Sequence, residues 1–243
     1  MHLITHLKYI DPDGMKPSDI IITGNKSQKA FNHLQEAVKG QLNLSMDENG
    51  KVTASQVKGS TLTQGGSELQ SAANNNTVIV NVSATDNDFT SGGEGPLLGF
   101  FGGNQTTVPF DDAIEGNSTS ITYTSQEVNS DALGNMSKAN GKPGQAMLHE
   151  VTGLYRGGKI AQDENLKFVR STANNNDADN PNSVNRRSHD GAINQGGDVF
   201  AHFYNTQGQE TYRQSDGSVP GAVKLIYRTG KDDIPFHQIP KPR

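Results

Sequence analysis

Apolar and polar residues alternate along the first third of the chain with two different periods. Residues 27–38 carry apolar side chains at helical spacing, so we expect an amphipathic helix that begins at Ser27 and ends before Gly40. The apolar face of this helix consists of Ala30, Phe31, Leu34, Ala37 and Val38. Residues 42–46 and 51–54 alternate with period two on either side of an Asn-Gly turn, and this pattern predicts a β-hairpin.

The rest of the chain predicts short strands separated by long polar loops. We expect a second helix at residues 67–73, and the apolar run at residues 77–82 predicts the strongest strand. Further extended segments are expected at residues 106–110, 120–124, 199–204, 209–213 and 222–227 and in the Pro-rich tail after Ile234. Loops rich in Gly and Asn are expected at residues 84–105, 134–144 and 171–185. Together these segments predict an α+β fold, with a small antiparallel sheet and a few helices.

The composition narrows the class of protein. The 243 residues carry a net charge of -5 and a hydrophobic fraction of 32%, which indicates a modest core surrounded by polar loops. The absence of cysteine excludes disulfides and thiolate metal sites. No apolar run reaches about 18 residues, so we expect no membrane span. The first ten residues lack the apolar core of a signal peptide. The sequence pI of about 5.8 argues against nucleic acid as a partner.

One apolar segment contains the residues most suggestive of chemistry. Residues 143–158 predict a central, largely buried helix, with Pro143 in its first turn and a Gly-Gly pair at its end. His149 and Glu150 lie in the middle of this segment among apolar residues. A carboxylate in such surroundings costs free energy unless it is paired or takes part in a reaction. This helix is therefore the place where we expect an active site.

The His-Glu pair matches part of a zinc-binding pattern. In zinc hydrolases, His-Glu-x-x-His places two His ligands one turn apart on a helix, and the Glu between them is the general base. The residue four positions after His149 is Gly153, which cannot bind a metal. A further ligand would have to come from elsewhere in the chain. The candidates left open by the sequence are Asp163, Glu164, Asp190 and His202.

The first 16 residues resemble the end of the core of bacterial RHS repeat-associated proteins. The segment Lys8 to Met15 contains a tyrosine followed by the turn Asp-Pro-Asp-Gly. In RHS-type proteins such a turn closes the conserved core, and a variable C-terminal module follows it. The resemblance implies that residues 1–16 are the tail of the core and that residues 17–243 are a single module. It also implies a longer parent protein that is secreted or displayed on the cell surface.

The region from residue 143 to residue 190 resembles the zincin-like domains found behind RHS cores. The matching residues are Leu148, His149, Glu150, Val151, Thr152, Tyr155, Gly157, Gly158, Ser188, His189 and Asp190. The resemblance implies a zinc-dependent peptidase toxin, with a protein or peptide substrate and an immunity protein as a partner. It makes His149 and His189 the zinc ligands. It also makes Glu150 and Tyr155 catalytic residues, with Glu150 as the general base. Gly153 stands in place of the middle ligand, so an inactive descendant is a version of the same hypothesis.

Other interpretations of these residues remain open at this stage. His149 could be a structural histidine bonded inside the core, and Glu150 could be paired with an arginine. The lean core and long loops are also typical of a non-enzymatic module that binds a protein or a glycan outside the cell. The basic run at residues 185–190 suggests a nuclease, which the acidic pI opposes. We expect His33 and His237 to lie at the surface.

Overall fold

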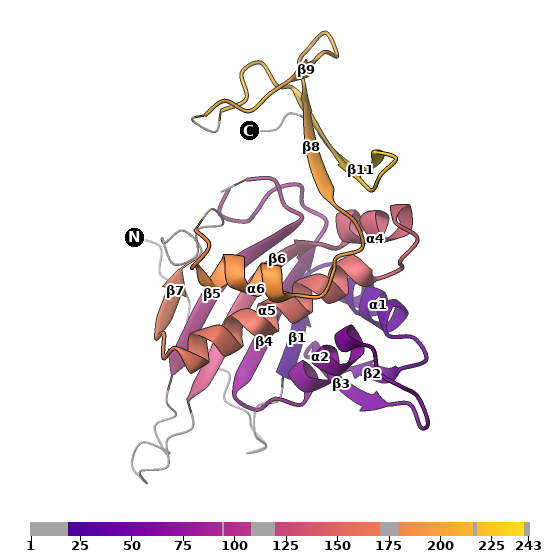
Figure 1. Ribbon diagram of the computed structural model, residues 1–243, viewed down its shortest axis with the longest axis vertical. Coiled ribbons are helices and arrows are strands. Elements are labelled where there is room, and N and C mark those ends of the chain that lie inside the picture. Colours follow the sequence, from indigo (N-terminus) through magenta and orange to yellow (C-terminus); the bar gives the residue numbers. More distant parts are fainter. Residues whose placement is uncertain (1–18, 94, 108–119, 171–179, 216–217, 241–243) are drawn as a thin grey trace.

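The computed structural model describes residues 19–93, 95–107, 120–170, 180–215 and 218–240. Residues 1–16, where the sequence resembles an RHS core, lie outside this range. The described chain forms two sheets and a group of helices (Figure 1). The helices are α1 (Ser27–Ala37), α2 (Gln64–Ala73), α4 (Ser130–Ala139), α5 (Gln145–Asp163) and α6 (Val184–Gly191). None of the helices in these ranges has the length and apolar character needed to cross a membrane.

The larger sheet has seven strands in the order β2-β3-β1-β4-β6-β5-β7. Its strands are β1 (Asp19–Thr23), β2 (Leu42–Met46), β3 (Lys51–Gln56), β4 (Val78–Thr85), β5 (Gly99–Thr107), β6 (Ile121–Asn129) and β7 (Phe168–Arg170). The central strands β1, β4 and β6 are parallel, and the strands on both sides of them pair in an antiparallel way. The α+β class is confirmed. The prediction of a small antiparallel sheet is wrong, because the apolar run of β4 lies at the centre of a mixed sheet.

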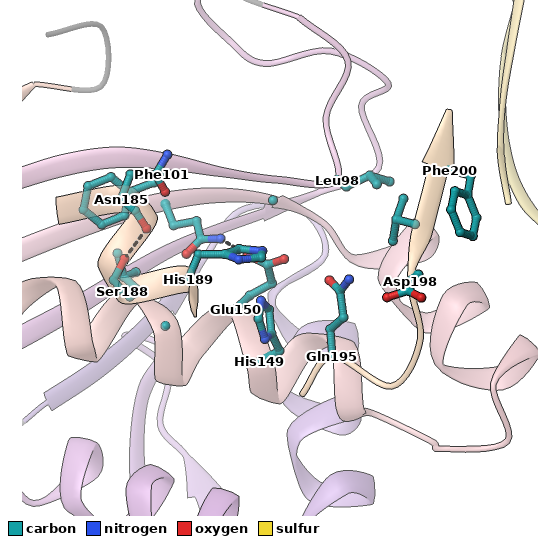
Figure 2. Close-up of a pocket in the computed structure, with 15 residues that line it drawn as sticks. Leu98, Phe101, His149, Glu150, Asn185, Ser188, His189, Gln195, Asp198 and Phe200 are labelled. Carbon is teal, nitrogen blue, oxygen red and sulfur yellow. Dashed lines mark hydrogen bonds between the residues drawn. The ribbon is translucent and has the colours of Figure 1, made fainter. Parts of the chain in front are cut away.

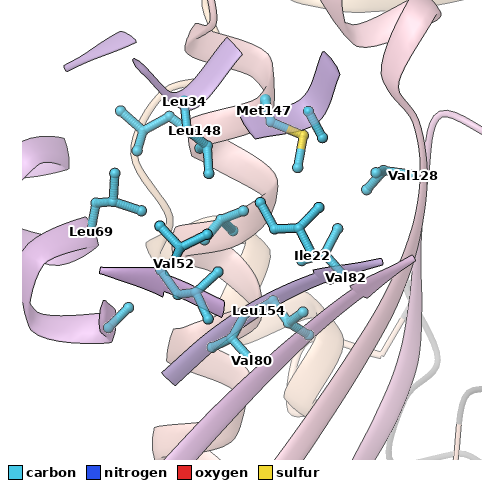
Figure 3. Close-up of a cluster of buried hydrophobic side chains, with 14 of the residues drawn as sticks. Ile22, Leu34, Val52, Leu69, Val80, Val82, Val128, Met147, Leu148 and Leu154 are labelled. Atoms are coloured by element: carbon cyan, nitrogen blue, oxygen red, sulfur yellow. The ribbon is translucent and has the colours of Figure 1, made fainter. Parts of the chain in front are cut away.

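The core lies between the larger sheet and α5. This helix contacts β4, β5 and β6 of the sheet, and α1, α2, α4 and α6 pack around it. Met147 and Leu154 of α5 are almost fully buried in the same cluster as Ile22 of β1 and Val80 of β4 (Figure 3). Burial of aliphatic side chains stabilises the fold by roughly 1.5–3 kcal/mol for each one. The helix that carries the candidate active-site residues is therefore the most extensively packed helix of the described chain.

The smaller sheet is antiparallel and stands away from the body (Figure 1). It has the order β11-β10-β8-β9, with the strands β8 (Val199–Tyr204), β9 (Glu210–Thr211), β10 (Lys224–Thr229) and β11 (Ile234–Pro240). Phe203, Leu225 and Ile239 form a separate small apolar cluster there. Phe236 joins the main core at the base of the sheet, and Asn140 Nδ2 donates a 2.9 Å hydrogen bond to Thr229 Oγ1.

Most of the predicted elements that fall on described residues are confirmed, but two segments expected as loops form regular structure. Residues 108–110 of the expected strand 106–110 and residues 171–179 of the expected loop 171–185 lie outside the described residues. In the segment 84–105, β5 begins at Gly99 and pairs with β6. In the segment 134–144, Gly134 lies inside α4. The ring of His33 packs where Gly134 has no side chain. His33 is 7% exposed, so its expected position at the surface is also wrong.

The expected end of the central helix at its Gly-Gly pair is wrong. Helix α5 continues to Asp163, well beyond Gly157 and Gly158. A Cβ on Gly157 would lie 2.9 Å from the ring of Phe101, and one on Gly158 would overlap the side chain of Val78 on β4. The two glycines therefore allow the helix to approach the sheet closely, and they do so within a regular helical turn.

Candidate functional site

His149 lies on α5 with a defined tautomer. The side chain is 5% exposed, and its Nδ1 is hydrogen-bonded to the backbone carbonyl of Ile193. A carbonyl oxygen can only accept, so Nδ1 carries a proton. This leaves Nε2 as the nitrogen that faces a ligand, which is the arrangement that second-sphere hydrogen bonds give to metal-binding histidines.

Glu150 follows His149 and is held by an amide rather than by an arginine. Gln126 Nε2 of β6 donates a hydrogen bond to Glu150 Oε2. The carboxylate lies against Gly99 of β5, where the Cβ of any other residue would overlap it. Two strands of the sheet therefore position this carboxylate, one through an amide and one through the absence of a side chain. No Lys or Arg of the described chain forms an ion pair with Glu150.

His189 lies on α6 and lines the same cavity as His149 and Glu150. Its ring centroid lies 4.9 Å from that of His149, with the two rings edge to face at 78°. Burial lowers the pKa of His189 below its usual value, and the neighbouring His149 lowers it further, whereas Glu150 raises it. The neutral imidazole is thus favoured, and this is the form that binds a metal or accepts a proton.

Helix α6 reaches this position because α5 presents two glycines to it. The side chain of Ser183 caps α6 by accepting a hydrogen bond from the backbone N–H of Arg186. A Cβ on Gly153 would lie 3.4 Å from Cβ of Ala192, and a Cβ on Gly157 would lie 3.5 Å from Cβ of Ser188. The residues at and just after α6 therefore occupy the space beside Gly153, where a zincin helix would carry its second histidine.

The three side chains line a cavity of about 570 Å³ (Figure 2). Phe101, Asn185 and Ser188 stand on one side of it, and Gln195, Asp198 and Phe200 stand on the other. The remaining lining residues are Leu98, Gly99, Gln126, Gly153, Leu154 and Val199. The lining includes two carboxylates and two imidazoles, and it includes no Lys or Arg of the described chain.

Tyr155 does not line this cavity. Its hydroxyl accepts a 2.9 Å hydrogen bond from Asn75 Nδ2, at the end of α2. The structure therefore brings His149, Glu150 and His189 together and places Tyr155 on another side of α5.

The other candidates for a ligand also lie outside the cavity, and each has its own partner. Asp190 pairs with Arg186 at 2.8 Å and Glu164 with Arg187 at 2.9 Å. The remaining pairs are Asp163 with Lys159 at 3.7 Å and His202 with Glu210 at 2.7 Å. Within the described ranges, no group of three or more His, Asp or Glu side chains has an arrangement that could hold a metal ion.

The described residues fit a zinc site only in part. Catalytic zinc sites have three protein ligands and a water molecule. His149 and His189 supply two imidazole nitrogens in an anionic cavity, and the tautomer of His149 suits ligation. Gly153 supplies no third ligand.

Several functional residues could not be found from the sequence. Gln126, Gly99 and Ile193 position the His-Glu pair through long-range pairing, and nothing in their local sequence marks them. Comparisons of the chain with protein-family models, with curated proteins and with solved structures give no significant match.

Proposed function

We propose that this chain is a hydrolase module of the zinc metallopeptidase type. The observation that carries the proposal is the convergence of His149, Glu150 and His189 in one cavity, from two helices that are far apart in the sequence. The RHS-like first residues support a role as the toxin or effector module of a longer protein, secreted or displayed on the cell surface. An immunity protein would then be its natural partner.

The three residues have distinct roles in this proposal. His149 and His189 would hold zinc through their imidazole nitrogens, and zinc bound there would polarise a peptide carbonyl as a Lewis acid. Glu150 accepts the proton of the attacking water, and the hydrogen bond from Gln126 holds its carboxylate in the cavity. The apolar side chains Leu98 and Phe101 line the cavity beside these groups.

Metal analysis of the purified chain tests the proposal. We expect about one zinc per chain by mass spectrometry, as for sites with catalytic zinc. His149→Ala should abolish zinc binding, whereas Glu150→Gln should retain the zinc and lose peptide cleavage by about 10²- to 10⁴-fold. Zinc that is absent from the wild type even after incubation with excess metal would overturn the ligand assignment. Cleavage that survives Glu150→Gln would overturn the assignment of the base.

A non-enzymatic interaction module is the second candidate. The observation that favours it is Gly153, which leaves the metal site with two protein ligands and packs against Ala192. A tight complex with a protein or glycan that survives both His149→Ala and Glu150→Gln would support this alternative. The nuclease interpretation has less support, because Arg186 and Arg187 are both held in ion pairs on the surface of α6.

A further inference from the structure

A second cavity adjoins the candidate site. It has a volume of about 720 Å³, and its lining comes from the end of α4, the loop before β8 and the turn between β10 and β11. Asp198 and Phe200 line both cavities, so the two cavities meet at these residues. Figure 2 shows both side chains across the first cavity from Phe101 and Asn185.

Asp198 presents a carboxylate that no cation of the described chain neutralises. Its backbone carbonyl accepts a 2.6 Å hydrogen bond from Thr229 Oγ1, which fixes the residue beside β10. Its exposed side chain forms no hydrogen bond or ion pair with another described residue. Lys142 and Lys231 line only the second cavity, and neither is paired with Asp198. The carboxylate is therefore available to a ligand.

Phe200 adds an aromatic surface beside this carboxylate. Phe200 is 45% exposed, although it lines both cavities. Phe200 and Asp198 line the same two cavities, so the ring and the carboxylate border the same space. An aromatic face attracts lysine and arginine side chains through its quadrupole and its apolar contact area. Two independent features of the same wall thus favour the same kind of ligand.

The charge of the first cavity agrees with these features. Its carboxylates are Glu150 and Asp198, and no Lys or Arg contributes to its described lining. Glu150 is held by Gln126 next to the histidines. Asp198 stands on the wall where the cavity opens toward its neighbour, so it can contact a part of the substrate away from the reacting bond.

We propose that Asp198 and Phe200 bind the cationic side chain of a lysine or arginine in a peptide substrate, beside the bond that faces Glu150. The ammonium or guanidinium group pairs with the Asp198 carboxylate, and the stem of the side chain packs on the ring of Phe200. This inference rests on the proposed function, since it names the class of peptide that the site would select.

A binding measurement tests the inference without any need for cleavage. The entire chain carrying Glu150→Gln is titrated against two fluorescent nonapeptides of Gly, Ala and Ser that differ only at the central residue. One peptide has lysine there, and the other has norleucine, which keeps most of the aliphatic stem and lacks the ammonium group. We expect the lysine peptide to bind about five- to tenfold more tightly, as an exposed ion pair together with a cation–π contact supplies.

Matched variants assign the preference to the proposed residues. Asp198→Asn, added to Glu150→Gln, should abolish the lysine preference, and Phe200→Leu should reduce it by about two- to fivefold. Glu48→Gln removes the same charge from the exposed turn between β2 and β3, and the preference should survive it.

The outcomes separate this inference from the proposed function. Equal affinity for both peptides, no binding of either, or a lysine preference that survives Asp198→Asn overturns the inference. Loss of zinc or of cleavage bears only on the proposed function, because the binding assay uses a chain without the general base. A lysine preference in a chain that binds no zinc would keep the recognition site and discard the peptidase.

Discussion

The body of the molecule and its smaller sheet are built in different ways. The body packs α5 onto a seven-stranded sheet, and its core cluster draws on most of the helices and strands there. Among the described residues, the buried cluster of the smaller sheet consists of Phe203, Leu225 and Ile239, and this sheet stands away from the body in Figure 1. Local stability follows the number of buried apolar contacts, so we expect the body to be rigid and the smaller sheet to open more readily.

The difference matters because the candidate site draws on both regions. His149, Glu150 and His189 come from helices of the body, whereas Asp198 and Phe200 come from the start of the smaller sheet. Chemistry requires groups that are held within a fraction of an ångström, and packed helices provide this. Recognition tolerates more movement. The contrast predicts a fixed catalytic wall that faces a wall able to adjust to the substrate.

Truncation of one buried leucine in each region gives the largest expected effect. Leu154 of α5 is 1% exposed and Leu225 of β10 is 0% exposed. Replacement of a buried leucine by alanine costs about 2–5 kcal/mol. We expect Leu154→Ala to lower the free energy of unfolding of the body by this amount, measured by urea denaturation. We expect Leu225→Ala to leave that transition in place and to remove hydrogen-exchange protection from β8, β10 and β11.

The matched pair also shows how the comparison could fail. If both variants shifted one shared urea transition equally, the two regions would unfold as a single cooperative unit. The stability of the small apolar cluster around Phe203 would then depend on the contact between the smaller sheet and the body, where Phe236 enters the main core.

The sequence predicted local elements better than their assembly. The periodicity of residues 27–38 and the Asn-Gly turn were sufficient for α1 and for the β2–β3 hairpin, because both depend on neighbouring residues. The parallel pairing of β4 with β1 and β6 depends on residues far apart, and the local pattern of β4 carries no signal of its partners.

The residues of the candidate site also fall into those that the sequence predicted and those that depend on long-range assembly. A resemblance singled out His149, Glu150 and His189, and the fold brings them to one cavity. Gln126 and Asp198 were not found, because their roles arise from strand pairing and from the position of the smaller sheet. The predicted end of α5 at its Gly-Gly pair is wrong because glycine often ends helices, whereas here it permits close packing of the helix on the sheet.

Substitution of two glycines of α5 by alanine should change the stability of the body by an intermediate amount. The Cβ of Gly157→Ala would lie 2.9 Å from the Phe101 ring, which must then move, and such overpacking costs about 1–3 kcal/mol. The Cβ of Gly153→Ala would meet Ala192 at an ordinary contact distance of 3.4 Å. Alanine also favours a helix over glycine by up to about 1 kcal/mol, so Gly153→Ala should be neutral or stabilising.

Thermal unfolding of both variants measures this difference. Equal destabilisation by the two substitutions would mean that α6 packs on Gly153 as tightly as the Phe101 ring packs on Gly157. Because Phe101 also lines the cavity, Gly157→Ala should in addition weaken peptide binding.

The pH dependence of stability gives the smallest expected effect and concerns both regions. Burial lowers the pKa of His33 in the body, against the raising effect of Glu36, whose carboxylate lies 3.6 Å from its Nδ1. Burial likewise lowers the pKa of His237 in the smaller sheet, against Asp88 at 3.2 Å. The unfolded chain then takes up protons below pH of about 6.5, whereas the folded chain resists them until its lower pKa values are reached.

Stability is therefore complete above this pH and declines as the pH falls toward the folded pKa values. We expect urea denaturation to show a lower free energy of unfolding of the body at pH 5 than at pH 7.5. His33→Gln should make this difference smaller, because it removes the titrating group from the contact between α1 and Gly134. It should leave the acid-induced loss of hydrogen-exchange protection in β11 unchanged, since His237 still titrates there. An unchanged pH dependence of the body in His33→Gln would show that this buried histidine does not contribute to acid sensitivity.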